Sequence, residues 1–331
     1  MKNKRILVTG GLGFIGSHFA ELLHERCQDC LITIVDNLSY CTARATEEFI
    51  WDLYQDKKNT LEILYKDIND YNSVHKHDYV INFAAESHVD NSIKNGQPFL
   101  DSNVNGLYNL LRQVDGQRFV QIGTDEVYGS LTLTDTPSVE TDLLKPSSVY
   151  SSTKAAADLI ALSFYTTHKK DIIVTRCTNN FGPRQYTEKL IPTVITRALN
   201  NKKIPLYGSG TNVREWIYVK EHCEKVYDVL LYGESGNIYN IRPDTINDYN
   251  NKHIIETILS ILEKDNNLIE YVTDRKGHDL RYALNDNKFQ KLNRQIQLDL
   301  PNTKNTFAKD LENTIIWYKE HYDWWDTKSI D

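Results

Sequence analysis

The fold is decided by the stretch Ile6-Leu7-Val8-Thr9-Gly10-Gly11-Leu12-Gly13-Phe14-Ile15-Gly16. It begins with a short apolar run, which is typical of a buried parallel strand, and residues 14–27 have the apolar pattern of a helix. Its glycines fit two spacings, GxxGxxG at 10, 13 and 16 and GxGxxG at 11, 13 and 16. Either spacing alone is weak, but between a strand and a helix it indicates a turn that binds a dinucleotide.

The glycine turn has the chemistry of a pyrophosphate site. Its first glycines allow a tight turn and a close approach of the backbone to phosphate, and the last allows the helix to pack on the strand. The helix N-terminus offers free N–H groups and the positive end of the helix dipole. We expect the cofactor to contact Gly10, Gly13, Phe14, Ile15 and Gly16. A turn that serves the backbone alone is the alternative interpretation.

The ends of the next three expected strands add candidate cofactor contacts. Asp36 lies 20 residues after Gly16, where a carboxylate accepts hydrogen bonds from the ribose hydroxyls and repels a 2′-phosphate. NAD is therefore favoured over NADP, although Arg44 could instead favour NADP. The further expected contacts are Asn37, Asp67, Ile68, Ala84 and Ala85. The Asp67-Ile68 pair meets the adenine edge or caps a helix, and the small alanines let the cofactor lie close to the strand ends.

The first half of the chain alternates strand and helix patterns. Strands are expected at 4–9, 31–35, 61–65, 79–83, 119–122 and 172–176, and helices at 14–27, 99–114 and 149–168. This alternation predicts an α/β fold with a doubly wound parallel Rossmann sheet. We expect an NAD-binding domain at 1–178, joined by about 215–238 because a helix over 219–232 returns to the sheet. A smaller α/β domain at 179–331 is expected to bind the substrate.

Composition excludes several classes of protein. The 331 residues contain 38 Lys and Arg against 45 Asp and Glu, a net charge of −7, so a basic groove for nucleic acid is not expected. No apolar run approaches the length of a transmembrane helix. An odd count of five cysteines favours a reducing compartment, and the Cys27–Cys30 pair has no second pair at zinc spacing. The sequence predicts a cytoplasmic protein without a metal site.

A second motif, Tyr150-Ser151-Ser152-Thr153-Lys154, has the spacing YxxxK. Positions i and i+4 share one face of a helix, so the Lys154 ammonium is expected beside the Tyr150 phenol. Together with a positive nicotinamide it would lower the tyrosine pKa from about 10, so that Tyr150 can accept a proton from a substrate hydroxyl. Tyr150 and Lys154 are thus expected both to catalyse and to contact the cofactor. A surface tyrosine with an extended lysine is the alternative.

With these two motifs the whole chain resembles the extended short-chain dehydrogenase/reductase family. The segment Thr124-Asp125-Glu126-Val127-Tyr128-Gly129 narrows the resemblance, because an adjacent Asp-Glu pair after Thr marks the nucleotide-diphosphate-glucose 4,6-dehydratases. Further matching segments lie at 84–90, 176–183, 188–192, 212–216 and 274–279. The late tryptophans at 317, 324 and 325 also resemble the C-terminal helix of that family.

The resemblance implies a reaction sequence and roles for five residues. Tyr150 takes the proton of the 4-hydroxyl with help from Thr124, while hydride passes from C4 to NAD. Glu126 then removes the C5 proton, which the 4-ketone has made acidic, and a protonated Asp125 gives its proton to O6. Water leaves, hydride returns to C6, and Glu126 reprotonates C5. Two acids this close push one pKa up, which helps to keep Asp125 protonated.

The resemblance also implies residues that bind a nucleotide-diphosphate sugar. The diphosphate contacts are Arg214 and Arg275 with Lys189 nearby; the sugar contacts are Ser87 and Asn179; the base contacts are Pro205, Leu206 and Tyr207. Asn240 is placed near the ribose or phosphates and Asn180 at the cofactor. The same motifs add His88, Glu188, Leu190 and His278 to the substrate site. Arg184 and Thr187 depart from the aromatic or proline residues that are common at their positions.

Three classes of function remain open at this stage. The first is a 4,6-dehydratase of dTDP- or UDP-glucose, or of UDP-N-acetylglucosamine with or without inversion at C5. The second is a UDP-sugar epimerase or decarboxylase, which has no need of an acid such as Asp125 at O6. The third is a non-catalytic NAD-binding protein, against which the intact catalytic motifs argue. The resemblance further implies a homodimer and a role in deoxysugar synthesis, such as that of rhamnose.

Overall fold

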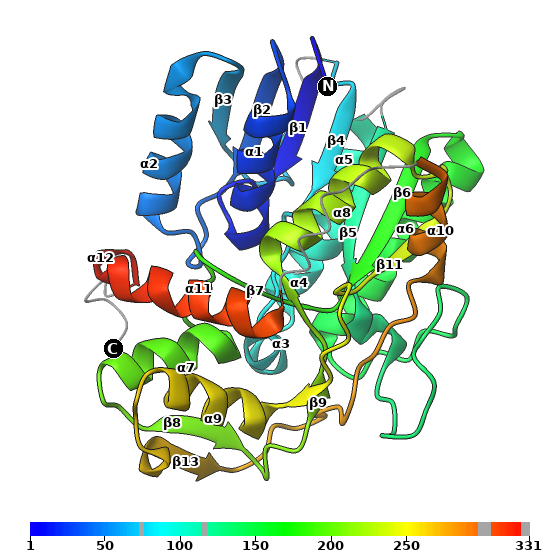
Figure 1. Cartoon of the computed structure of the whole chain (residues 1–331). Coiled ribbons are helices and arrows are strands. Elements are labelled where there is room, and N and C mark those ends of the chain that lie inside the picture. Colours follow the sequence, from blue (N-terminus) through cyan, green and yellow to red (C-terminus); the bar gives the residue numbers. More distant parts are fainter. Residues whose placement is uncertain (73–75, 114–117, 297–305, 326–331) are drawn as a thin grey trace.

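The chain forms a seven-stranded parallel sheet in the order β11-β6-β5-β4-β1-β2-β3. A computed structural model describes residues 1–72, 76–113, 118–296 and 306–325 (Figure 1). The strands are β1 Arg5–Thr9, β2 Leu31–Asp36, β3 Thr60–Tyr65, β4 Tyr79–Asn82, β5 Arg118–Thr124, β6 Asp171–Cys177 and β11 Ile238–Ile241. The order reverses between β1 and β4, so the glycine turn after β1 lies at the switch point, where open α/β sheets bind ligands.

Helices cover both faces of this sheet, as expected of a doubly wound fold. Ile6 and Val8 of β1 pack in one core with α1 and α8, and Leu7 between them packs in another with α5 and α6. Figure 1 shows α1 and α8 on one side of the sheet and α5 and α6 on the other. The helices are α1 Phe14–Arg26, α5 Leu107–Gln113, α6 Val149–His168 and α8 Val219–Tyr232. The predicted fold class is confirmed.

The single helix predicted over residues 99–114 is divided into three elements in the structure. These are α4 Gln97–Leu100, a π-helical turn η2 Asp101–Gly106, and α5, while residue 114 lies outside the described residues. Polar Asn103 inside the turn is 3% exposed and bonds to neighbouring segments, which explains why an ordinary helical repeat is not kept. Four further elements were not predicted: α2 Arg44–Leu53, η1 Tyr54–Asp56, α3 Val89–Lys94 and η3 Asp125–Tyr128.

The second half of the chain contains a separate apolar core, in which α7, α9, α11 and the Trp324–Trp325 pair meet. The further helices of this half are α7 Leu190–Leu199, α9 Asn251–Ile261, η4 Asn266–Leu268, α10 Asn287–Ile296 (which packs in the core that contains α1 and α8), α11 Phe307–Glu320 and α12 Tyr322–Trp325. Its strands form three pairs: β7 Asn179–Phe181 with β10 Trp216–Tyr218, β9 Val213–Arg214 with β12 Tyr249–Asn250, and β8 Ile204–Tyr207 with β13 Ile269–Val272. The boundary between the two domains stays a prediction.

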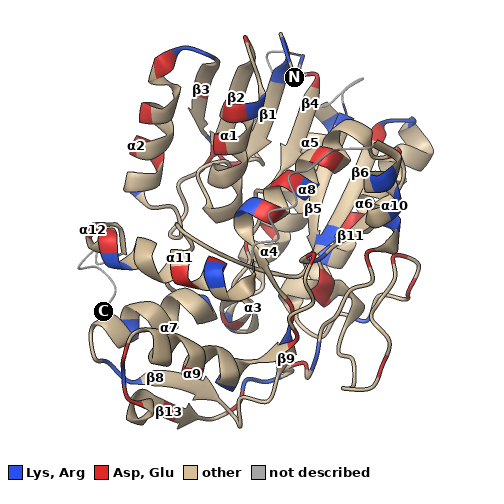
Figure 2. Ribbon diagram, viewed as in Figure 1, with Lys and Arg blue, Asp and Glu red and all other residues tan. Residues whose placement is uncertain are grey.

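Basic and acidic residues are interspersed along the ribbon in the view of Figure 2. None of the helices in the described part of the chain is long and apolar enough to cross a membrane. Within the same residues, no three His, Cys, Asp or Glu side chains gather as metal ligands would.

Candidate active site

A cavity of about 560 Å³ lies at the carboxyl ends of the sheet strands. It brings together every predicted cofactor residue: Gly10, Gly13, Phe14, Ile15, Gly16, Asp36, Asn37, Asp67, Ile68, Ala84, Ala85, Tyr150, Lys154 and Asn180. Thr124, Asp125, Glu126, Ser87, Asn179, Glu188 and Lys189 line the same cavity. Motifs that lie more than 170 residues apart in the sequence therefore face the same cavity.

The glycine turn leaves room for a phosphate group in front of α1. Gly10 has a φ of 65°, and a Cβ there would lie 2.7 Å from the backbone nitrogen of Ala84. A Cβ at Gly16 would overlap the carbonyl oxygen of Gly10, whereas one at Gly13 would meet only that oxygen, at 3.3 Å. Gly13 is the N-cap of α1 and has no side chain to cap the first turn. The open N–H groups thus fit a pyrophosphate.

Asp36 is held in place at the end of β2. Its carboxylate accepts hydrogen bonds from the backbone N–H groups of Leu12 at 3.0 Å and Leu38 at 2.9 Å. Asn37 next to it donates to Asp67 at 3.0 Å, which joins the ends of β2 and β3 around the cavity. A fixed carboxylate beside the glycine turn fits the ribose of NAD.

The predicted catalytic side chains come from β5, η3 and α6. Thr124 ends β5, and its hydroxyl donates to the Asp125 carboxylate at 3.2 Å. Tyr150 and Lys154 lie one turn apart on α6, and the Lys154 ammonium donates to the carbonyl oxygen of Ile122 at 2.6 Å. A reciprocal capping box of Ser148 and Ser151 fixes the start of that helix.

The pKa values of both acids are raised. Burial, with the nearby Glu126 charge as the second cause, raises the pKa of Asp125 well above its ordinary value, and Arg214 partly opposes this. Burial also raises the pKa of Glu126, against the opposing charges of Arg214, Lys189 and Arg275. The direction at Asp125 is the one that its expected role as the protonated acid requires, although burial contributes more than the second acid.

Tyr150 is buried near Glu126. Burial, and next the charge of Glu126, raise its pKa well above the ordinary value, and the hydrogen bond with Thr124 lowers it. Burial also lowers the pKa of Lys154 itself. The expected lowering of the Tyr150 pKa depends on a positive nicotinamide as well as on Lys154, so it stays a prediction.

The remaining predicted substrate residues lie outside the lining of this cavity. Arg275 approaches Asp90 at 3.7 Å, and the Tyr207 hydroxyl donates to the same carboxylate at 3.2 Å. Arg214 lies over the Tyr282 ring at 4.2 Å and donates to the carbonyl oxygen of Asp279 at 2.9 Å. Because the charges of both arginines act on Glu126, they lie close to the acids.

The other predicted substrate residues lie on nearby elements or segments. Pro205 and Leu206 lie on β8 with Tyr207, Leu190 begins α7, and His278 contacts Asp274 at 2.7 Å. Lys189 donates to the Ser87 carbonyl oxygen at 2.7 Å. His88 lies 3.8 Å from Glu188, so the segments after β4 and before α7 meet at the cavity.

Asn240 was wrongly predicted to contact the substrate. It lies in the edge strand β11 and is 0% exposed. Its side chain accepts a hydrogen bond from the Tyr128 hydroxyl at 2.8 Å and donates to the carbonyl oxygens of Ser138 and Asn285. The amide is used in internal hydrogen bonds, so Asn240 supports η3 from behind instead of lining the cavity.

Asn103 does not line the cavity, but it holds Glu86, which does, and the sequence reasoning missed this supporting residue. Its side chain accepts a hydrogen bond from the Glu86 N–H at 2.8 Å and donates to the Glu86 carbonyl oxygen at 3.1 Å. It also donates to the Thr153 hydroxyl on α6 at 3.0 Å. The polar run Asp101-Ser102-Asn103 inside a helical pattern was the available signal, since π-turns occur often at functional sites.

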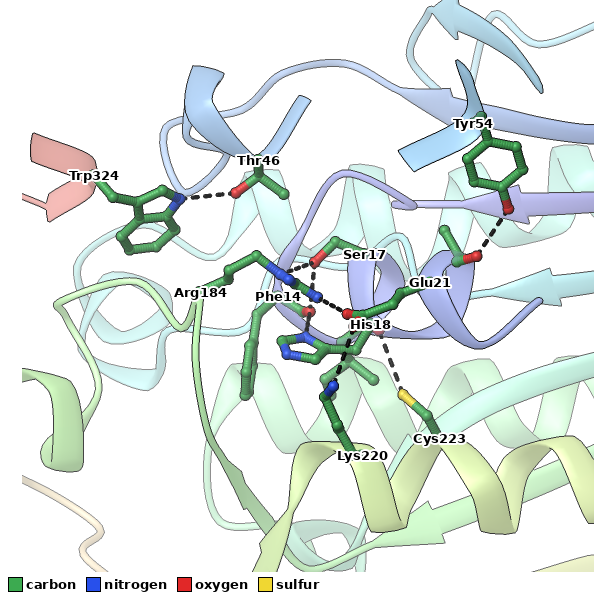
Figure 3. Close-up of polar contacts among 12 residues, drawn as sticks. Phe14, Ser17, His18, Glu21, Thr46, Tyr54, Arg184, Lys220, Cys223 and Trp324 are labelled. Carbon is green, nitrogen blue, oxygen red and sulfur yellow. Dashed lines mark hydrogen bonds and ion pairs between the residues drawn. The ribbon is translucent and has the colours of Figure 1, made fainter. Parts of the chain in front are cut away.

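Arg184, one of the atypical positions, fastens the loop before α7 to α1. Its guanidinium donates to Glu21 at 2.6 Å and to the Ser17 hydroxyl at 3.3 Å (Figure 3). It also lies over the Phe49 ring of α2 at 4.4 Å. The loop that contains Glu188 and Lys189 is thereby held against the helix that begins at the glycine turn.

Comparison with known proteins agrees with this geometry. A family model described as GDP-mannose 4,6 dehydratase matches residues 7–301. The chain belongs to this family. The short-chain dehydrogenase/reductase resemblance inferred from the motifs is thereby confirmed. The narrower resemblance, to the nucleotide-diphosphate-glucose 4,6-dehydratases, is supported by the individual relatives.

A dTDP-glucose 4,6-dehydratase of Mycolicibacterium smegmatis is 38% identical over 97% of this chain and 95% of its own length. The low-salt glycan biosynthesis protein Agl12 of Haloferax volcanii is 42% identical over 87% of this chain and 92% of its own. DesIV, a dTDP-glucose 4,6-dehydratase of Streptomyces venezuelae solved with NAD bound, superposes with a TM-score of 0.88. It is 37% identical, and the match covers 97% of this chain and 99% of DesIV. Family members of the dehydratase type are thus similar to this chain from end to end.

Proposed function

We propose that this protein is an NAD-dependent 4,6-dehydratase of a nucleotide-diphosphate hexose. The observation that supports this most is the pair Asp125 and Glu126 in one cavity with Tyr150, because dehydration needs an acid and a base besides the group that deprotonates the 4-hydroxyl. The raised pKa of Asp125 supplies the acid. Epimerisation at C4 has no use for it.

Tyr150 begins the reaction by accepting the proton of the 4-hydroxyl, while the Thr124 hydroxyl orients O4. Bound NAD would accept the hydride from C4 and, once reduced, return it to C6, and its positive charge would oppose the charge of Glu126 that acts on Tyr150. Burial of Tyr150 excludes water from the proton transfer. The order is forced, because the C5 proton becomes acidic only next to a ketone.

Glu126 and Asp125 then perform the two proton transfers of the elimination. Glu126 removes the proton at C5, and Asp125 donates its proton to the leaving O6. After hydride has reached C6, Glu126 returns its proton to C5. Since the two carboxyl groups are adjacent on η3, they act on adjacent carbons of one sugar.

The nucleotide end is proposed to bind between η3, the loop before α7 and β8. Arg275 and Lys189 oppose the charge of Glu126 and are the proposed diphosphate contacts, with Arg214 beside them. Ser87, His88, Asn179, Glu188, Leu190 and His278 are proposed for the sugar and phosphates, and Pro205, Leu206 and Tyr207 for the base.

A substrate panel tests the proposed function. The purified protein is incubated separately with dTDP-glucose, UDP-glucose, UDP-N-acetylglucosamine and GDP-mannose, and the products are identified by mass and NMR. We expect a 4-keto-6-deoxy sugar from one of them. Interconversion at C4 without loss of water would contradict the proposal. The base, the sugar and the link to rhamnose stay predictions until then.

The position of Asp36 beside the glycine turn leads to a prediction about NAD binding. Asp36→Ala removes the carboxylate proposed to hold the ribose hydroxyls, so the variant is expected to lose most of the copurifying NAD without unfolding. Nucleotide released by denaturation reports the loss, and circular dichroism reports the fold. Finding NADP in the wild-type protein would contradict the assignment.

We further propose a homodimer formed through α6 and the helical segment of α4, η2 and α5. The apolar side chains Leu100, Tyr108 and Leu159 are exposed there by 44%, 50% and 58%. Two copies that paired these helices about a two-fold axis would cover them in a four-helix bundle. Sedimentation is expected to give a dimer at micromolar concentration and a monomer for Leu159→Glu. A monomeric wild-type protein would contradict the proposal.

A further inference from the structure

A buried ion pair joins α6 to β6 behind the catalytic side chains. The Arg176 guanidinium donates to the Asp158 carboxylate at 2.8 Å, and the two side chains are 2% and 0% exposed. The chemistry proposed above uses neither residue. A buried pair is also a poor source of stability, because its desolvation cost can exceed its attraction. The pair is therefore expected to serve the neighbouring site.

Asp158 lies on the same face of α6 as the two catalytic residues, because positions 150, 154 and 158 are one helical turn apart. Lys154 donates to the carbonyl oxygen of Ile122. The second Asp158 oxygen has no hydrogen-bond partner among the described residues and lies against Gly123, where a Cβ would come within 3.1 Å of it. The ammonium and the carboxylate thus flank consecutive residues of β5.

Asp158 is the strongest charge that acts in favour of the Lys154 ammonium. Burial lowers the pKa of Lys154, and Asp158, followed by the Cys177 thiol of β6, opposes this. Arg176 is not among the groups that act on Lys154. The ionisable groups that line the cavity with Lys154 include Tyr150 on α6, Asp125 and Glu126 on η3, and Asp101 on η2.

We propose that Asp158 is a positioning residue that keeps the Lys154 ammonium protonated, and that Arg176 holds the Asp158 carboxylate in place. Arg176 also lies over the ring of Tyr128 at 4.8 Å, at the end of η3. One buried pair thus supports both the helix of Tyr150 and the turn of the two acids. The part that the Lys154 charge plays in catalysis rests on the proposed function. The effect of Asp158 on the protonation of Lys154 does not depend on that function.

Titration of Lys154 tests the proposal without any substrate. The full-length protein is labelled with ¹³C at lysine Cε, and the Lys154 signal is identified by its loss in Lys154→Met. Asp158→Asn is expected to lower the titration midpoint of Lys154 by about one to two pH units. Asp158→Glu is expected to restore the wild-type midpoint. An Asn variant with an unchanged midpoint would overturn the proposal.

Asp171→Asn is the matched control. Asp171 forms a partly exposed ion pair with Arg118 at 2.9 Å, which joins the first residues of β6 and β5, at the other end of these strands from Arg176. Its loss removes an Asp–Arg pair without removing charge near Lys154, so the midpoint is expected to stay at the wild-type value. A shift as large as that of Asp158→Asn would also overturn the proposal, since it would indicate a general loosening of the fold.

A double variant covers the case in which Asp158→Asn fails to fold because Arg176 is left unpaired. Asp158→Asn with Arg176→Gln leaves no buried charge at the pair, and the Lys154 midpoint is still expected to fall. In the active enzyme, the alkaline limb of the rate of C4 oxidation should move to lower pH, because Lys154 loses its proton earlier. If no variant oxidises a sugar, the wild type included, the proposed function fails while the Lys154 titration still tests this inference.

Discussion

Glu126→Gln is expected to oxidise C4 and then stop. Glutamine cannot accept the C5 proton, so NADH absorbance should appear when the nucleotide sugar is added and should persist, because elimination cannot follow. Turnover is expected to fall by roughly 10²–10⁴-fold, as for the loss of one general base. Single-turnover absorbance and product analysis measure the two effects together.

Deuterium exchange provides the control for Glu126→Gln. In deuterated water the wild-type protein should place deuterium at C5, and the variant should not. A variant that turns over normally, or that exchanges C5 at the wild-type rate, would show that Glu126 is not the base at C5.

Asp125→Asn is expected to have the complementary defect. The variant should still exchange the C5 proton but should lose water roughly 10²–10⁴-fold more slowly, because asparagine cannot protonate O6. A substrate with fluoride at C6 should recover much of the rate, since fluoride leaves with less need of a proton. No recovery with fluoride would contradict the role of Asp125 as the acid.

The pH dependence of water loss gives a second check on Asp125. Because the pKa of Asp125 is raised, its acid form persists above the ordinary range of an aspartic acid. The wild-type rate of elimination should fall at low pH, where Glu126 becomes protonated, and should decline again as the pH rises through the raised pKa of Asp125. The Asn variant should lack this decline.

The sequence predicted correctly those helices whose ends are determined by residues next to them in the chain. The helices α6 and α8 have the predicted bounds, and for α6 the reason is the capping box at Ser148. The interruption of the helix over 99–114 could not be predicted, because it accompanies hydrogen bonds of Asn103 to Glu86 and Thr153. Those partners are far away in the sequence and meet Asn103 only in the folded chain.

The candidate site shows the same division. The glycine turn and the YxxxK motif are each an unbroken stretch of sequence, so their residues could be named from spacing alone. The prediction that Asn240 contacts the substrate was wrong, because a motif match does not reveal which way a side chain points from an edge strand. In the folded chain the Asn240 amide donates to the carbonyl oxygens of Ser138 and Asn285. The burial that raises the Tyr150 pKa could not be predicted either, since burial depends on the whole fold.

The fate of the hydrogen at C4 tests the central claim most directly. The protein is incubated in ordinary water with the nucleotide sugar that the panel identifies, deuterated at C4, and the product is examined by mass and NMR. The account predicts a product lighter by one water, with the deuterium at C6 and an ordinary hydrogen at C5. A product of unchanged mass, with C4 inverted and the deuterium still at C4, would contradict it.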